Sequence, residues 1–352
     1  MLKLNVMYML SVISASVLIS GCTAADKNTA PHDESGKSAY SRSNQSTQSD
    51  QSVSVSEGSS GLPESKSETG AYNKDKGTLK SLTYSNLLDT ESQEEVKAAL
   101  VDSGIDENAI KKFFDSVNYF NSNVDTESLV QKGFISSEKL SPEYDQIAIQ
   151  QKWAEKNPDF IGCNCRITTF TLLKDLIKIK NSSSDGNSDT ESDFLTFDIS
   201  AVKNAPESLF DDEQMKFFKS VFDEMPTTKS MDTDVHVEAF KKEWRKRGVS
   251  FDESSKARMI SVVFNSDLDD KQTLFIGHVG VLVPGKDNKL LFIEKLAFQE
   301  PYQVLKFDDK SQVAEYLMYK YDVEWDQKTA HPFIMDNDSL IEGYGIYNLN
   351  KN

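Results

Sequence analysis

The chain has 352 residues, with 39 Lys and Arg against 56 Asp and Glu, so its formal net charge at pH 7 is −17. Nucleic-acid binding needs clustered cations that face the phosphates, and we therefore expect no nucleic-acid partner. The three cysteines, Cys22, Cys163 and Cys165, are too few for a disulfide-dense scaffold or for a structural four-cysteine zinc site. We expect no cofactor.

Residues 1–21 have the pattern of an export signal. Lys3 gives a basic start, an apolar core covers 6–19, and small residues ending in Gly21 lead to Cys22. In bacterial lipoproteins, Ile-Ser-Gly-Cys is a lipobox, whose cysteine receives a diacylglycerol and becomes the new N-terminus after cleavage. We therefore predict a lipid anchor at Cys22 and a location on the extracellular face of the cell membrane. A transmembrane helix is the alternative, but the apolar stretch is short and broken by serines.

Residues 22–78 are predicted to form the lipidated end and a disordered tether. Nine of the twenty residues in 41–60 are Ser, and only Val53 and Val55 among these twenty are aliphatic, so this tract cannot bury a core. We expect it to lift a folded domain off the membrane. The composition is globular from residue 79, and we expect a single domain over 79–352 that carries a net charge of −16.

Helices are expected before strands in this domain. Apolar residues at helical spacing predict helices over 91–101, 106–120, about 143–156, about 207–223 and about 233–247. After the third of these, a loop is expected to enter a further, buried helix at Cys163 or Cys165. Residues 181–193 are polar and without periodicity, which is typical of a surface loop.

The second half of the domain is rich in β-branched and aromatic residues. Turn-forming runs separate these residues into predicted strands over 260–264, 273–283, 289–297 and 302–307. We expect an antiparallel meander, followed by a helix at about 310–320 and an irregular tail. The fold class is therefore α+β, with a helical N-terminal part packed on an antiparallel sheet.

Three polar residues interrupt apolar elements of this domain. Cys165 is expected at the start of a buried helix, where the helix dipole and free amides favour the thiolate. His278 lies in the apolar strand LFIGHVGVLV, and Glu294 lies in the next one, LLFIEKL. A nucleophile needs a base and a group that orients the base, which makes these residues candidates for a catalytic triad. Asn164, through its amide or side chain, is the candidate oxyanion donor.

The hairpin between the two strands decides whether His278 and Glu294 share a face. An odd loop around 286–288 pairs Gly280 with Glu294 and makes His278 the diagonal, same-face neighbour of Glu294. An even loop would place the two on opposite faces and exclude the triad. Gly277 and Gly280 flank His278 and would let a substrate backbone approach it.

Other interpretations remain open for these residues. Cys165 would be a small buried helix residue and His278 a core histidine. Glu294 would then form a structural ion pair with Arg166 or Arg258.

The remaining candidates have their own interpretations. Cys163 is a free thiol, a disulfide partner of Cys165, or a metal ligand with His278. His331 is the alternative base, and His236 is expected on the surface. Trp153 and Trp244 are expected in the core.

The order of helix cysteine, strand histidine and acid on the next strand resembles the papain-like hydrolases, including NlpC/P60 cell-wall peptidases and transglutaminase-like enzymes. Over 79–347, the segments YSNL, NCRIT, FIGHVGVL and LLFIEKLAFQEPYQV resemble a family of Gram-positive surface lipoproteins, domain of unknown function 4300. The first resemblance implies a papain-like arrangement, and the second implies a surface lipoprotein without an established activity.

Together these features predict a surface lipoprotein whose domain is a papain-like cysteine hydrolase or acyltransferase. Its target would be a peptide or amide bond, in a wall peptide or in a host protein. We expect a monomer, held at the membrane by the N-terminal lipid. The alternative is a non-catalytic binding or adhesion module, whose negative charge would suit a cationic partner.

Overall fold

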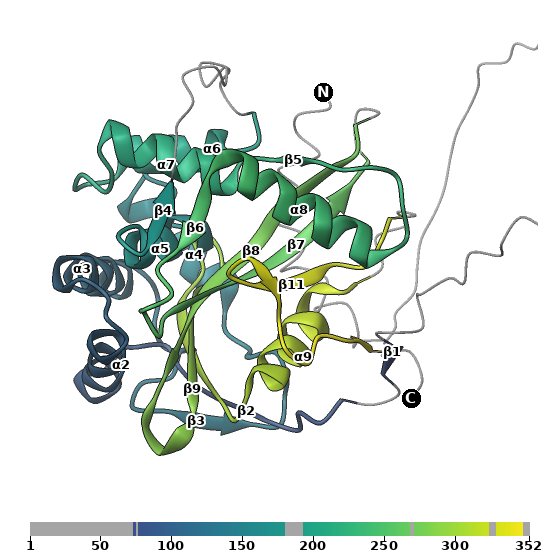
Figure 1. Cartoon of the computed structure of the whole chain (residues 1–352). Helices are drawn as coiled ribbons and strands as arrows, with labels where there is room; N and C mark the ends of the chain where they lie inside the picture. The colour runs from purple at the N-terminus through teal and green to yellow at the C-terminus, as the bar shows by residue number, and fades with distance from the viewer. Residues whose placement is uncertain (1–72, 75–76, 180–192, 268–270, 324–328, 348–352) are drawn as a thin grey trace, which may run out of the picture. The chain divides into compact units, whose positions relative to one another are not determined.

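A large antiparallel sheet forms the centre of the folded part (Figure 1). The computed structural model describes residues 73–74, 77–179, 193–267, 271–323 and 329–347. Within these ranges the main sheet has nine strands in the order β12-β11-β7-β8-β9-β10-β2-β3, with β5 paired to β8. The strands are β2 (Leu82–Ser85), β3 (Ile135–Ser137), β5 (Met225–Pro226), β7 (Arg258–Ser266), β8 (Thr273–Pro284), β9 (Leu290–Lys295), β10 (Tyr302–Phe307), β11 (Phe333–Asp336) and β12 (Ser339–Leu340).

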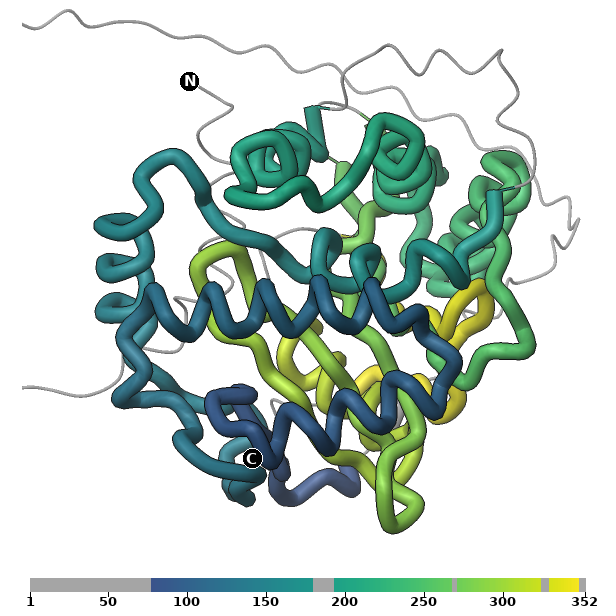
Figure 2. Tube along the Cα trace, turned by 90° about the vertical axis from the view of Figure 1, so that its left-hand side faces the viewer, coloured from purple at the N-terminus to yellow at the C-terminus, as the bar shows by residue number. Residues whose placement is uncertain are grey.

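Eight α-helices lie around this sheet in the described part of the chain. They are α2 (Thr90–Asp102), α3 (Glu107–Asn123), α4 (Gln146–Lys156), α5 (Cys165–Leu173), α6 (Thr196–Asn204), α7 (Asp212–Phe222), α8 (Thr233–Arg247) and α9 (Lys310–Tyr321). Helix α5 packs directly on β8 and β9, α3 covers α5, and α2 lies beside α3, as Figure 2 shows. Helix α9 contacts β10 and β11. The fold is α+β, as predicted.

Side-chain caps explain why most helices were predictable. Seven of the eight begin after an Asp or Asn whose side chain accepts a backbone N–H of the first turn. Helix α6 has no such cap, since Leu195 precedes it, and the sequence pattern did not predict it. The predicted surface loop lies, up to residue 192, outside the described residues.

Two parts of the predicted order of elements are wrong. The tail is not irregular, because β11 pairs with β7 and extends the main sheet. The N-terminal part is not only helical, because β2 pairs with β10 on one side and β3 on the other. Both β2 and β11 are only four residues long, the minimum length for a strand pattern, and their pairing partners are distant in sequence.

The core and the remaining pairings complete the fold. Trp153 and Trp244 are buried, as predicted. Strands β4 (Ile177–Ile179) and β6 (Val249–Phe251) form a separate antiparallel pair. None of the described helices is long and apolar enough to span a membrane.

Residues before 79 make contacts with the folded part. The pair β1 (Asn73–Lys74) and β13 (Ile346–Tyr347) is parallel. On α9, the buried Glu315 accepts the backbone N–H of Thr78 at 2.7 Å and that of Leu79 at 2.9 Å. The last residues of the predicted tether therefore contact the domain. Residues 1–72, which include the predicted signal, Cys22 and most of the tether, lie outside the described residues.

A chain that begins at residue 80 should be less stable than one that begins at residue 67. The shorter chain lacks both backbone donors to the buried carboxylate of Glu315, and an unsatisfied buried group costs about 1–3 kcal/mol. Urea denaturation followed by circular dichroism would measure the difference in the free energy of unfolding. The chain from residue 67 should match the full chain; equal midpoints for the two truncations would contradict the role of Glu315.

Candidate active site

Cys165 is the first residue of α5, and the local sequence explains why the helix begins there. The preceding Asn164 is extended, and its Oδ1 accepts the backbone N–H of Ile167 at 3.0 Å. The loop before it turns at Gly162, whose φ is +99° and where an added Cβ would lie 2.2 Å from the carbonyl oxygen of Phe298. Only glycine fits this turn. The backbone N–H of Cys165 has no carbonyl partner within the helix.

His278 owes its orientation to an irregularity in β8. Val262 pairs with His278, whereas the next residue, Val263, pairs with Ile276, so Gly277 is the extra residue of a β-bulge. Bulges re-aim the side chains beside them. The imidazole of His278 stacks on the ring of Tyr321, with centroids 4.8 Å apart and planes at 25°.

The register that the sequence suggested for the hairpin is confirmed. Gly280 pairs with Glu294, and the backbone N–H of Gly285 donates to the carbonyl of Lys289 at 2.7 Å around a three-residue loop. Nε2 of His278 consequently donates to Oε2 of Glu294 at 2.6 Å. His278 also forms a side-chain hydrogen bond with Cys165.

The electrostatics of the three residues favour a charged pair. Burial alone would raise the pKa of the Cys165 thiol, but the hydrogen bond and charge of His278, with the charge of Arg166, lower it. Burial alone would lower the pKa of His278, but Cys165 and Glu294 raise it. Burial is likewise outweighed at Glu294, where Lys320 and His278 lower the pKa to about 2. The arrangement favours a thiolate beside an imidazolium.

A buried ion pair joins the helix of Cys165 to the strand of His278. Asp198 on α6 accepts Nε and an Nη of Arg166, both at 2.8 Å, and Nδ2 of Asn164 at 2.7 Å. The other Nη of Arg166 donates to the carbonyl of Ile276, beside the bulge, at 3.0 Å. Asp198 was not predicted; its only sequence signal is an acid within the apolar run FLTFDIS.

This network decides two of the open interpretations. Arg166 pairs with Asp198, and Arg258 pairs with Asp336, so neither is the partner of Glu294. The side chain of Asn164 is engaged at both ends, as helix cap and as donor to Asp198. The remaining candidate donors of this first turn are therefore backbone N–H groups.

Cys163 is a second buried thiol with different surroundings. Both thiols are free, and burial raises the pKa of Cys163 to about 11. Within the described residues, no group of three or more His, Cys, Asp and Glu is arranged to hold a metal ion.

Two expectations about the surroundings are wrong. The glycines beside His278 do not open a passage to a substrate, because a Cβ at Gly277 or Gly280 would lie 2.5 Å from the ring of Phe264 or Phe292. His236 is not on the surface: it is fully buried and bonded to the hydroxyl of Thr227 and the carbonyl of Ser230.

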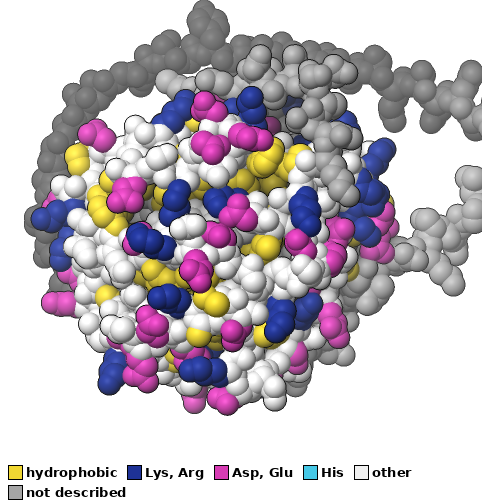
Figure 3. All heavy atoms as spheres, turned by 60° about the vertical axis from the view of Figure 1, so that its left-hand side comes forward, with side chains coloured by type: hydrophobic (Ala, Val, Ile, Leu, Met, Phe, Trp, Pro, Cys, Tyr) yellow, Lys and Arg dark blue, Asp and Glu magenta, His cyan; other side chains and the backbone are white. Residues whose placement is uncertain are grey.

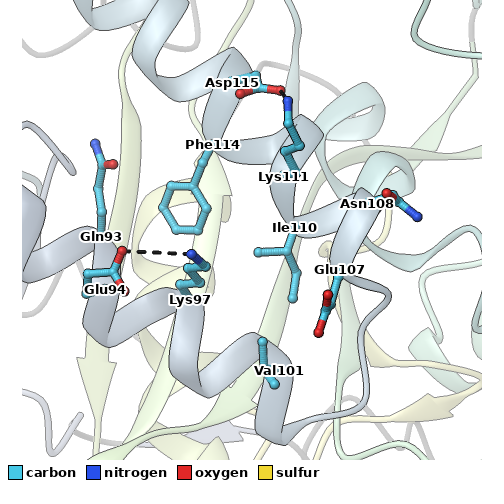
Figure 4. Close-up of a pocket in the computed structure, with 10 residues that line it drawn as sticks. All are labelled: Gln93, Glu94, Lys97, Val101, Glu107, Asn108, Ile110, Lys111, Phe114 and Asp115. Atoms are coloured by element: carbon cyan, nitrogen blue, oxygen red, sulfur yellow. Dashed lines mark hydrogen bonds and ion pairs between the residues drawn. The ribbon is translucent and has the colours of Figure 1, made fainter.

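His331 is paired with a different acid, and a surface groove is lined by other residues. His331 forms a pair with Asp322 at the surface, at 2.8 Å. A groove of about 610 Å³ lies between α2 and α3, with Ile110 and Phe114 among residues that line it and charged side chains around them (Figure 4). None of the predicted site residues lines this groove.

Replacing Asp198 with Asn should destabilise the fold by about 3–5 kcal/mol, because Arg166 would keep a buried charge without its counterion. Chemical denaturation would measure this loss. Asp252→Asn is the matched control, since Asp252 pairs with Lys178 at the same 2.8 Å but near the solvent, and should cost far less. Similar losses for both variants would contradict the assigned role of the ion pair.

Alkylation of Cys165 should reach half its maximal rate below pH 9, the ordinary pKa of the thiol, because His278 lowers that pKa. His278→Ala removes the lowering contribution and leaves burial, so the half-maximal pH should move upward. Cys163 should stay unreactive up to about pH 11. Mass spectrometry after iodoacetamide pulses across pH would measure both thiols; an unchanged profile in His278→Ala would count against the charged pair.

Comparison with known proteins identifies the family. No curated protein and no solved structure matches the chain. A family match covers residues 83–341, a range that includes Cys165, His278 and Glu294. Since this range is most of the chain, the protein belongs to the family described as domain of unknown function (DUF4300).

Proposed function

We propose that the domain is a papain-like cysteine hydrolase or acyltransferase that acts on a peptide or amide bond. The observation that carries the proposal is the position of His278, which is hydrogen-bonded both to Glu294 and to Cys165 at a helix start. Covalent catalysis requires a nucleophile, a base and an acid that orients the base. In this proposal these roles belong to Cys165, His278 and Glu294, in that order.

The chemistry follows from these positions. The thiolate of Cys165 attacks the substrate carbonyl carbon, and the electron pair of the C=O bond moves to oxygen. Backbone N–H groups at the start of α5 would stabilise this oxyanion. When the C–N bond breaks, His278 protonates the leaving amine and a thioester remains on Cys165. His278 then removes a proton from water or an acceptor amine, which attacks the thioester and releases the thiolate.

The proposed location is the extracellular face of the membrane. The lipobox at Cys22 and the serine-rich tract up to residue 78 support a lipid-anchored domain on a tether. A wall peptide or a host protein is then the accessible substrate. On the face drawn in Figure 3, basic side chains are interspersed with acidic ones, which does not favour nucleic acid.

A non-catalytic binding module is the second candidate. Cys165 is 5% exposed and His278 is 1% exposed, so a substrate reaches the thiol only if side chains around it move. A domain with a net charge of −16 would suit a cationic partner. The two candidates differ in one property, the reactivity of Cys165.

An electrophilic thiol probe on the purified protein separates the two candidates. Labelling should be lost in Cys165→Ala and should fall by about 10²–10⁴-fold in His278→Ala, because the base is removed. Cys163→Ala is the matched control and should label like the unmodified protein. If Cys165 resists the probe in the folded protein, or if Cys163 is the labelled thiol, the binding module is the better function.

Lipidation at Cys22 is tested separately. Cys22→Ala should leave the signal attached and abolish incorporation of radiolabelled fatty acid, because no thiol remains to receive the diacylglycerol. Membrane fractionation and N-terminal mass spectrometry would measure both effects. A Cys22→Ala protein that is still cleaved after Gly21 and still carries lipid would refute the lipobox.

A further inference from the structure

The second oxygen of Glu294 contacts a group of residues outside the triad. Oε1 accepts the hydroxyl of Tyr316 at 2.6 Å and Nε2 of Gln303 at 2.9 Å. The ammonium of Lys320 lies 3.9 Å from the same oxygen and donates to the Tyr316 hydroxyl at 3.1 Å. Tyr316 and Lys320 are four residues apart on α9, so they lie on the same face of this helix.

We propose that α9 positions Glu294 for its interaction with His278. Tyr316 holds the orientation of the carboxylate, and Lys320 offsets part of its negative charge. The strength of the bond from Glu294 to His278 is then set by residues outside the triad. This inference rests on the proposed function for its catalytic meaning, but the interaction itself is measurable without any reaction.

The hydrogen bonds to Glu294 indicate that its carboxylate is held in one orientation and is not merely packed. Gln303 and Tyr316 bring two hydrogen bonds to one oxygen, which leaves Oε2 for His278 alone. Lys320 brings an ammonium to within 3.9 Å of the carboxylate, and its side chain is 19% exposed whereas Glu294 is fully buried. A single charge at this distance, in a site with little water, affects a buried carboxylate far more than a surface one.

Several other ionisable groups around this site also contribute to its electrostatics, in addition to Lys320. They are Cys165 and Arg166 on α5, Tyr316 and Tyr321 on α9, and Tyr144 and Glu300 from loops. Glu300 is hydrogen-bonded to Tyr144 and Gln146 at 2.6 Å each. Lys320 is the ammonium that most lowers the pKa of Glu294.

The test follows the imidazole of His278 by NMR in the full chain. Cys165→Ala serves as the parent, so that the ring titrates without the thiol. Lys320→Met removes a cation that opposes the imidazolium and leaves Glu294 less neutralised, so His278 should lose its proton about one pH unit higher. Tyr316→Phe removes the donor that orients the carboxylate, so the bond to His278 should weaken and the ring should lose its proton at a lower pH than in the parent. The His278 signal is identified by its loss in His278→Gln.

Two variants complete the design. Lys320→Arg keeps the charge and should titrate like the parent. Lys97→Met removes an ion pair with Glu94 that also measures 3.9 Å but lies on the surface, and it should leave His278 unchanged. If Lys320→Met and Tyr316→Phe both titrate like the parent while thermal melts show them folded, the positioning role is wrong.

A second readout links the inference to the proposed function. This readout is the alkylation of Cys165 by iodoacetamide, measured in Lys320→Met with the thiol present. A shifted titration with an unreactive Cys165 would refute the proposed function and keep the positioning role. A reactive Cys165 with an unshifted titration would refute the positioning role alone.

Discussion

The buried ion pair between Arg166 and Asp198 is the constraint on which the site depends. It joins three elements that are separate in the sequence, α5, α6 and β8, and each oxygen of Asp198 has a donor. The cost of burying these charges is offset only because the guanidinium and the carboxylate satisfy each other. Arg166 reaches Ile276, two residues before His278, so the start of the thiol's helix and the strand of the imidazole are held together.

Burial and charge oppose each other throughout the site. Each of Cys165, His278 and Glu294 is buried, and burial alone would drive each toward its neutral form. Each instead favours its charged form, because a neighbouring residue of the site supplies the opposite charge or a hydrogen bond. A set of residues that only filled space would not need this series of mutually dependent charges, and for this reason we favour chemistry over packing.

Several features of the site could be predicted because they depend on local rules. Asn164 caps a helix through its own side chain, so the start of α5 beside Cys165 was close to predictable. The three-residue loop at 286–288 sets the pairing of Gly280 with Glu294, and only its odd length had to be assumed. The bulge at Gly277 was not predicted, because no local pattern distinguishes it from a glycine that makes room for a substrate.

The sequence by itself determined the α+β class, most helices, the hairpin of β8 and β9, and the three residues that could act together. These depend on periodicity, caps and turn length, which are properties of neighbouring residues. Only the tertiary structure decided that Asp198 is the partner of Arg166, that His236 is buried, and that Tyr316 and Lys320 meet Glu294. The physical reason is that these contacts join residues 9 to 32 positions apart through packing, and no single segment encodes its partner.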